Sequence, residues 1–205
     1  MRLKLVQLGE EVLRQPAREV LAEEIRSGSL RQLIADMHET LQDAPGVGLA
    51  APQVGVSIQL AIVEDLPEYS RDIATGQLAE RERRPVPFQV LINPEIVARG
   101  QEQTEFFEGC LSLTGFTALV PRSRQVTVRC LDEHGQSKVI EASGWNARIL
   151  QHEIDHLNGT IYIDRMESRS FMSAENFNRW WKEKPVTEVK RRLLAGKAGE
   201  GAKRR

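Results

Sequence analysis

The segment His-Glu-Ile-Asp-His at residues 152–156 constrains this chain more than any other feature of the sequence. Residues four positions apart on an α-helix lie one above the other, so His152 and His156 can both reach one metal ion. Glu153 follows the first histidine, where its carboxylate can contact a water molecule on that ion rather than the ion itself. The alternative is a polar helix with two unrelated histidines. The metal interpretation requires a helix here, with room beside it for an ion and a water molecule.

Two histidines do not complete such a site, because a catalytic zinc-type centre uses three protein ligands and one open position. The candidates for the third ligand are His38, His134, a carboxylate or a cysteine. The longer motif of the metzincin peptidases requires a histidine at position 162, where this chain has Tyr162. Glu175 would instead be the third ligand of the other zincin type of peptidase.

Cys110 is the competing candidate, within the segment Glu-Gly-Cys-Leu-Ser at residues 108–112. Gly109 beside it predicts a turn that exposes the sulfur. Cys130 lies in a strand-like run, and we interpret it as a buried, unreactive thiol. With only these two cysteines, disulfides cannot organise the fold, which favours a reducing compartment.

The length of 205 residues and the 40% hydrophobic content fit one globular domain with additional segments. No apolar run approaches the ~18 residues of a membrane-spanning helix, and the first residues lack the apolar stretch of a signal peptide. The net charge of −1 hides an asymmetry, because residues 182–205 hold nine Lys or Arg against three Glu. We therefore expect an acidic body with a basic tail, which is either a solvated end or a contact for an anionic surface.

Hydrophobic periodicity predicts an α+β fold with mostly antiparallel strands. Helices are expected at residues 30–41, at residues 146–157 and in a last segment after Phe171. Ser29 is expected to cap the first of them. The expected strands cover residues 58–63, 90–92, 96–98, 118–120, 125–130, 138–142 and 161–163. The chain before residue 30 and the Gly- and Pro-rich residues 46–55 are expected to be irregular, and the polar residues 65–87 to form a surface insertion.

Three segments of the chain resemble motifs of the peptide deformylase family. They read GVGLAAPQVG at residues 46–55, EGCLS at residues 108–112 and QHEIDHLNG at residues 151–159, in the family's order and spacing. The resemblance covers roughly residues 3–165. It implies a deformylase domain at residues 1–170, with antiparallel sheets packed around a central H-E-x-x-H helix, and a C-terminal helix and basic tail at residues 171–205.

The resemblance also implies the chemistry of the site. Cys110, His152 and His156 would bind one divalent ion per chain, Fe²⁺ in the cell, with Zn²⁺, Ni²⁺ or Co²⁺ as substitutes. Glu153 would be the general acid and base that removes the formyl group from the N-terminal formyl-methionine of newly made polypeptides, releasing formate. Gln53 and the backbone N–H of Leu111 would stabilise the charge that develops on the formyl oxygen.

The substrate peptide would lie along residues without bulky side chains. Gly46 and Gly48, with Val47 between them, would let it approach the backbone and pair with it in strand fashion, and Glu108 and Gly109 would border it. The chain departs from its relatives just after the second motif. Most relatives have a proline there, where this chain has Leu113, and some bacterial members have a basic residue where this chain has Thr117. Of the properties that the resemblance implies, the substrate preference is therefore the one that the sequence determines least.

The remaining expectations concern partners and location. We expect nascent formyl-Met polypeptides as substrate, ribosome contact through the basic tail, a cytoplasmic location and no membrane association. Two rival interpretations stay open: a metallopeptidase that uses Glu175 as its third ligand, and a catalytically silent binding protein built on the same fold.

Overall fold

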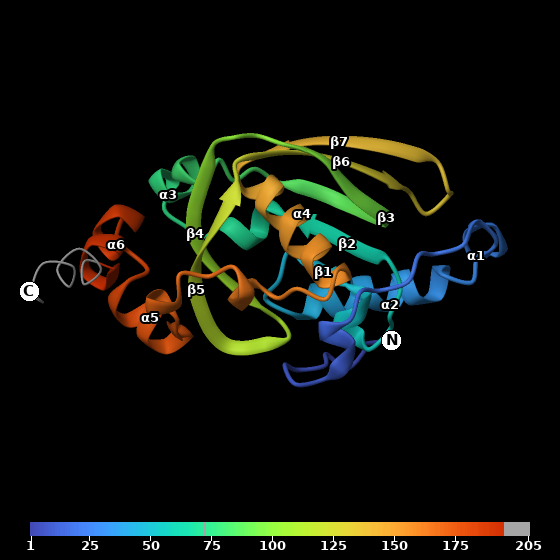
Figure 1. Ribbon diagram of the computed structural model, residues 1–205, viewed down its shortest axis with the longest axis horizontal. Coiled ribbons are helices and arrows are strands. Elements are labelled where there is room, and N and C mark those ends of the chain that lie inside the picture. The colour runs from blue at the N-terminus through green and yellow to red at the C-terminus, as the bar shows by residue number, and fades with distance from the viewer. Residues whose placement is uncertain (72, 195–205) are drawn as a thin grey trace, which may run out of the picture.

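A computed structural model describes residues 1–71 and 73–194 of the chain, and two antiparallel sheets pack around helix α4 (Gly144–Leu157) (Figure 1). The larger sheet has the strand order β1-β2-β3-β6-β7, formed by Gly48–Ala50, Leu60–Asp65, Val86–Arg99, Gln125–Leu131 and Ser137–Ser143. The smaller sheet has the order β4-β5-β8, formed by Gln103–Cys110, Leu113–Ser123 and Met172–Ser173. The predicted α+β fold with antiparallel sheets is confirmed.

Helix α4 carries the His-Glu-Ile-Asp-His segment through the centre of the molecule. Eleven of its 14 residues are buried, so strands surround the helix instead of leaving one face in solvent. Its apolar side chains, among them Ile149, Leu150 and Ile154, form one core cluster with Ala61 and Val63 of β2. The helix also contacts β5 of the smaller sheet. The motif residues are therefore held between the two sheets.

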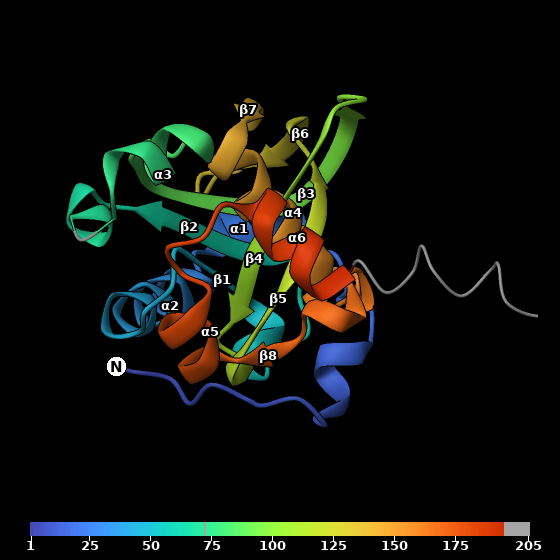
Figure 2. The ribbon, with the colours of Figure 1, turned by 90° about the vertical axis from the view of Figure 1, so that its left-hand side faces the viewer.

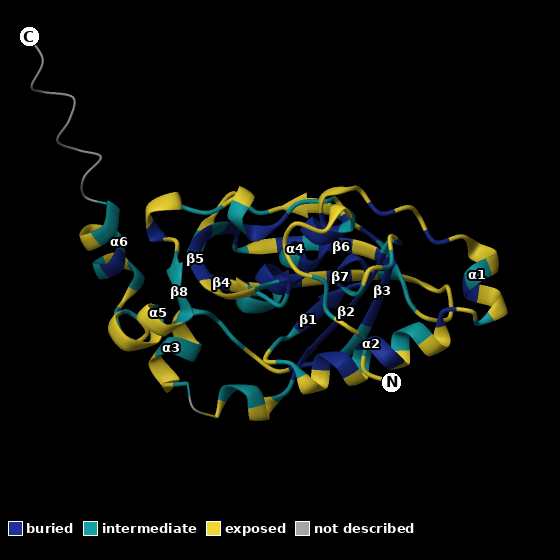
Figure 3. Cartoon of the chain, turned by 90° about the horizontal axis from the view of Figure 1, so that it is seen from below, coloured by how far each residue is buried: buried dark blue, intermediate teal, exposed yellow. Residues whose placement is uncertain are grey.

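Helix α2 (Arg31–Asp43) covers the opposite face of the larger sheet. Alternate residues of a strand point to opposite faces, and β2 follows this rule. Leu60 and Ile62 pack with Met37 and Leu41 of α2, whereas the residues between them face α4. Strand β2 is consequently buried on both faces, and Figure 3 shows β1, β2 and α4 in the colours of buried chain.

The other helices lie at the periphery. Helices α5 (Ala174–Trp180) and α6 (Val186–Leu194) gather at one end of the molecule, and α1 (Ala22–Ser27) lies at the other (Figures 1 and 2). Short 3₁₀ turns cover Glu11–Arg14, Ala51–Val54, Pro67–Ser70, Tyr162–Asp164 and Ser168–Ser170. Among the helices of the described chain, none combines the length and the apolar character needed to cross a membrane.

The first third of the chain is more regular than the sequence predicts. Helix α1 and a 3₁₀ turn lie before residue 30, and the segment 46–55 contains strand β1 followed by another 3₁₀ turn. Ser29 does not cap α2, because the N-cap position is Leu30 and no side chain caps it. Strand β1 forms despite its glycine because it pairs with β2, with Gly48 opposite Val63. Tertiary pairing overrides the local preference here.

Of three further expectations about local structure, the first is confirmed with different bounds and the other two are wrong. Residues 90–92 and 96–98 belong to one strand, β3, which is interrupted by a register shift between Ile92 and Glu95. Residues 161–163 are not a strand, because the Asp164 carboxylate accepts the N–H of Ile161 and closes a 3₁₀ turn. Gly109 is not in a turn, because strand β4 continues to Cys110 and the turn follows at residues 111–112.

The polar residues 65–87 connect β2 to β3 and include helix α3 (Thr75–Glu80). Asp65 at their start is buried and accepts two hydrogen bonds from Arg83, each of 2.8 Å. The segment is therefore closed at its base by an ion pair. Of the basic tail predicted at 182–205, residues 195–205 lie outside the described residues.

Candidate metal centre and active site

Strand β4 and helix α4 bring together three side chains that could bind one metal ion. The ligand atoms of Cys110, His152 and His156 all lie within 4.8 Å of one another, and Cys110 Sγ is 3.2 Å from His156 Nε2. Burial lowers the pKa of His156 well below its usual value, so this imidazole is neutral, as a metal ligand must be. A thiolate with two imidazoles suits several first-row divalent ions. The three side chains therefore fit a single ion.

The carboxylate of Glu108 orients His152. Glu108 Oε2 lies 3.0 Å from His152 Nδ1, which leaves the other ring nitrogen for a metal ion. Metal-binding histidines commonly hold a carboxylate in this way, and the contact fixes both the tautomer and the ring position. Burial alone would raise the pKa of Glu108, but the hydrogen bond to His152 and the charge of Arg122 lower it below the ordinary carboxyl range. Glu108 is therefore ionised.

Glu108 belongs to a buried network of charges that sequence reasoning missed. Arg122 of β5 donates two hydrogen bonds of 3.0 Å to its carboxylate, and Arg148 of α4 donates another. Arg122 also pairs with Asp155, whose carboxylate is held by Arg165 at 2.6 and 2.8 Å. The one sequence feature that could have indicated this network is Asp155, an acidic residue inside the histidine motif. Its side chain faces the network and not the metal ligands.

Glu153 lies beside the metal ligands in an enclosed position. Its side chain is buried, and its Oε2 has no hydrogen-bond partner within the described structure. Burial raises its pKa to about 7. A carboxyl group that titrates near neutrality can both accept and return a proton. Gly48 of β1 lies directly against it, since a Cβ at that position would be 2.4 Å from Glu153 Oε1.

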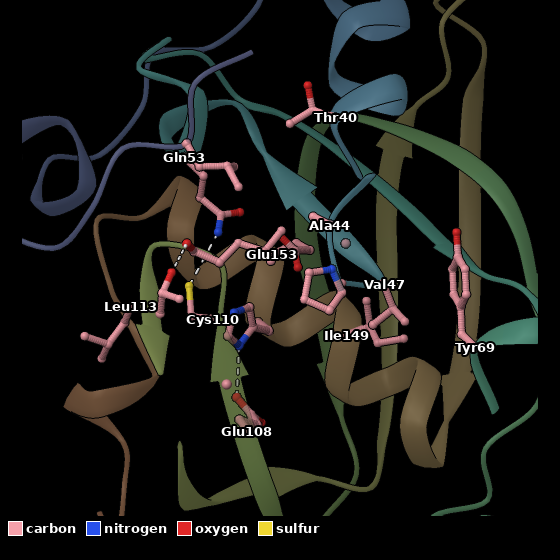
Figure 4. Close-up of a pocket in the computed structure, with 18 of the residues that line it drawn as sticks. Thr40, Ala44, Val47, Gln53, Tyr69, Glu108, Cys110, Leu113, Ile149 and Glu153 are labelled. Carbon is pink, nitrogen blue, oxygen red and sulfur yellow. Dashed lines mark hydrogen bonds and ion pairs between the residues drawn. The ribbon is translucent and has the colours of Figure 1, made fainter. Parts of the chain in front are cut away.

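Gln53 completes the inner wall of the site. Its Oε1 accepts the backbone N–H of Ala50 at 2.8 Å, which turns the amide so that its NH₂ group faces the site. Gln53 Nε2 is 3.4 Å from Cys110 Sγ. Figure 4 shows the side chains of Gln53, Cys110 and Glu153 directed toward one another from three different elements.

These groups lie in a cleft of about 920 Å³. The eleventh predicted site residue, His156, lies behind its lining with the other two candidate metal ligands. The other ten line the cleft: Gly46, Val47, Gly48, Gln53, Glu108, Gly109, Cys110, Leu111, His152 and Glu153. Strand β1 is the outer strand of the larger sheet and β4 is the outer strand of the smaller one. The cleft therefore runs between two sheet edges. Tyr69 of the 65–87 segment borders it at a distance from the metal ligands (Figure 4).

The other candidates for the third ligand lie elsewhere. His38 pairs with Glu64 at 3.0 Å, and His134 lies exposed in the turn between β6 and β7. Glu175 is exposed on α5 and does not join the two motif histidines. Within the described chain, Cys110, His152 and His156 are the one cluster of three or more such side chains that could hold a metal ion.

A cysteine and two histidines around one possible ion position, with a buried carboxyl group beside them at the end of a cleft of about 920 Å³, have the arrangement of a mononuclear metallohydrolase. The sequence pattern described as polypeptide deformylase matches residues 2–171. The chain belongs to the polypeptide deformylase family.

Relatives and solved structures agree with this assignment. The chain is similar to "Peptide deformylase 1A, chloroplastic" of Solanum lycopersicum, with 42% identity over 85% of this chain and 63% of the relative. It is also similar to "Peptide deformylase 3" of Streptomyces avermitilis, with 43% identity over 88% of this chain and 79% of the relative. The Met-Ala-Ser-bound crystal structure of a class I type b peptide deformylase from Acinetobacter baumannii matches with a TM-score of 0.72 and 34% identity, over 81% of this chain and 99% of that one. The chain thus spans less than two thirds of the length of the tomato relative.

Proposed function

We propose that this chain is a metal-dependent peptide deformylase, which hydrolyses the formyl group from the N-terminal formyl-methionine of newly made polypeptides and releases formate. The observation that carries the proposal is the meeting of Cys110, His152 and His156 within 4.8 Å, with the unpartnered carboxyl of Glu153 beside them. A peptide-binding cleft that ends at such a centre suits attack on a terminal amide.

In this proposal Cys110, His152 and His156 hold one divalent ion per chain, Fe²⁺ in the cell, with Zn²⁺, Ni²⁺ or Co²⁺ as substitutes. When bound, the ion supplies Lewis acidity that activates water and polarises the formyl carbonyl. Cys110 serves as a ligand and not as a nucleophile. Glu108 contributes by holding His152, because its carboxylate is already occupied by His152, Arg122 and Arg148. Its backbone, with that of Gly109, borders the peptide.

Glu153 moves the protons of the reaction. It accepts a proton from the water that attacks the formyl carbon, and it then donates a proton to the amine that leaves. Its pKa of about 7 suits both steps near neutral pH. Gln53 Nε2 and the backbone N–H of Leu111 donate hydrogen bonds to the formyl oxygen as negative charge develops there.

The substrate peptide enters as an added strand between β1 and β4. Gly46, Val47 and Gly48 offer backbone groups on one side, because the two glycines present no side chain to the cleft, and Gly109 does the same on the other side. Two sheet edges facing one cleft favour an extended peptide as occupant.

Formate release from formyl-Met-Ala-Ser by the iron-loaded enzyme, purified anaerobically, tests the function. Glu153→Ala is expected to abolish deformylation and keep the metal, whereas Cys110→Ala is expected to lose the metal. Glu175→Ala is the matched control and should retain both. If Cys110→Ala kept metal and activity while Glu175→Ala lost them, the zincin peptidase interpretation would replace this one.

We place the enzyme in the cytoplasm and propose that its basic C-terminus contacts ribosomal RNA. Residues 182–205 carry nine basic and three acidic side chains. Helix α6 packs on the body through Val189, so deletion of residues 195–205 removes charge without removing that contact. Co-sedimentation with ribosomes should weaken as salt rises from about 50 to 200 mM, and the deletion should weaken it further. Unchanged binding after the deletion would refute the contact.

A further inference from the structure

The segment that follows the family match packs against the strand that supplies Cys110. The family pattern ends at residue 171, and helices α5 and α6 come after it. On β4, Phe106 and Glu108 are buried on the side of α4, so the residues that alternate with them face the opposite way. Glu105 and Phe107 lie on this outer face, where α5 and α6 cover both of them.

Two contacts join this outer face to the C-terminal helices. The ring of Phe107 lies 4.6 Å from the ring of Phe177 on α5, at an interplanar angle of 47°. The carboxylate of Glu105 pairs with Lys190 of α6 at 2.7 Å. Strand β8 fixes the start of α5, because Ser173 pairs with Phe116 of β5 and its Oγ accepts the N–H of Asn176. Phe177 is therefore held in place relative to the smaller sheet.

Phe107 also lines the cleft. It lies three residues before Cys110 on an extended strand, which is about 10 Å from the metal ligand at ~3.3 Å per residue. The formyl-methionine must occupy the metal end of the cleft. An extended peptide that follows the edge of β4 from there reaches Phe107 with its second or third residue.

We propose that Phe177 is a positioning residue for substrate selection: it holds Phe107 as an aromatic wall against which the second and third residues of the substrate pack. This inference rests on the proposed deformylase function. Aromatic pairs strengthen packing through their relative orientation as well as their buried area. Without the Phe177 ring, the Phe107 ring is free to turn away from the cleft, while the metal ligands and Glu153 keep their places.

Steady-state kinetics of Phe177→Ala on two substrates of different length test the proposal. For formyl-Met-Ala-Leu, KM is expected to rise about two- to tenfold, which is the loss of affinity that one aromatic contact accounts for. The value of kcat should stay within about twofold of the wild type. For formyl-Met amide, which ends before Phe107, both constants should stay at the wild-type values. Phe177→Leu should restore most of the affinity. Trp180→Ala, on the same helix with a side chain 56% exposed, is the matched control and should change neither substrate.

A double-mutant cycle of Phe177→Ala with Phe107→Ala distinguishes positioning of the Phe107 ring from general destabilisation of the fold. If Phe177 acts through Phe107, the double variant should have the KM of Phe107→Ala alone. Equal losses on the short and the long substrate, additive effects, or no effect on either would overturn the proposal. A wild-type enzyme that releases no formate would refute the proposed function instead, so the two failures are distinct.

Discussion

Replacing Gly48 by alanine tests the geometry of the site with a single methyl group. The added Cβ would lie 2.4 Å from Oε1, 2.7 Å from Cδ and 2.8 Å from Cγ of Glu153. Ordinary contacts of a Cβ atom begin at 3.4 Å, so the carboxyl group must retreat by about 1 Å. The backbone of β1 is held by its pairing with Val63 and cannot easily move instead.

The displacement falls on the group that we propose as the proton carrier. A shift of about 1 Å in a catalytic group typically costs on the order of 100-fold in rate, because reacting atoms must lie within hydrogen-bond reach. We therefore expect kcat for formate release to fall about 100-fold, with metal content unchanged. The free energy of unfolding should change by less than ~1 kcal/mol, since a Gly→Ala change also restricts the unfolded chain.

Gly46→Ala is the matched control, because it adds the same methyl group in the same segment of the cleft. Its nearest neighbour would be Leu111 Cδ1 at 3.0 Å, the tip of a flexible side chain, and not Glu153. The methyl group faces the peptide and can raise KM, whereas kcat at saturating substrate should fall by no more than about threefold. The assay is formate release from formyl-Met-Ala-Ser at saturating substrate, with metal measured on the same samples. A Gly48→Ala enzyme with near wild-type kcat, or a Gly46→Ala enzyme equally impaired, would refute the placement of Glu153.

Three further predictions follow from the buried charges and thiols. Arg122→Ala should lower the free energy of unfolding by about 3–5 kcal/mol because it removes the buried cation that two buried carboxylates share, whereas the Arg165 side chain is 45% exposed and Arg165→Ala should cost less than ~1 kcal/mol in urea denaturation. Glu108→Gln should weaken metal affinity about 10- to 100-fold in a competitive chelator titration, and wild-type affinity would contradict the orienting role of this carboxylate. Iodoacetamide should label Cys110 of the metal-free protein, zinc should protect it, and Cys130 should stay unlabelled in both cases because burial raises its pKa, as peptide mass mapping would show.

The sequence predicted the central helix and most strands because their patterns are local. The alternation along residues 125–131 and 137–143 and the turn between them are readable from neighbouring residues alone. Strand β4 was not predicted, because the adjacent Phe106 and Phe107 break the alternation of apolar and polar residues. The structure gives the reason: Phe106 lies near Trp145 of α4, and Phe107 packs against α5 on the other face. Both faces of the strand are covered by elements far along the chain, which no local pattern reveals.

The charge network beneath the metal centre was hidden for the same reason. Arg122, Arg148 and Asp155 are residue types usually found on a solvated surface. Their pairing with one another or with Glu108, across 14 to 40 positions of the chain, offsets the cost of burying their charges. Cys110 and Glu108 belong to the smaller sheet, the histidines belong to α4, Gly48 belongs to the edge strand β1 of the larger sheet, and Gln53 belongs to the 3₁₀ turn that follows β1. The three motifs therefore become one centre only when both sheets have closed on the helix, so metal binding should be coupled to folding of the entire domain and not to the helix motif alone.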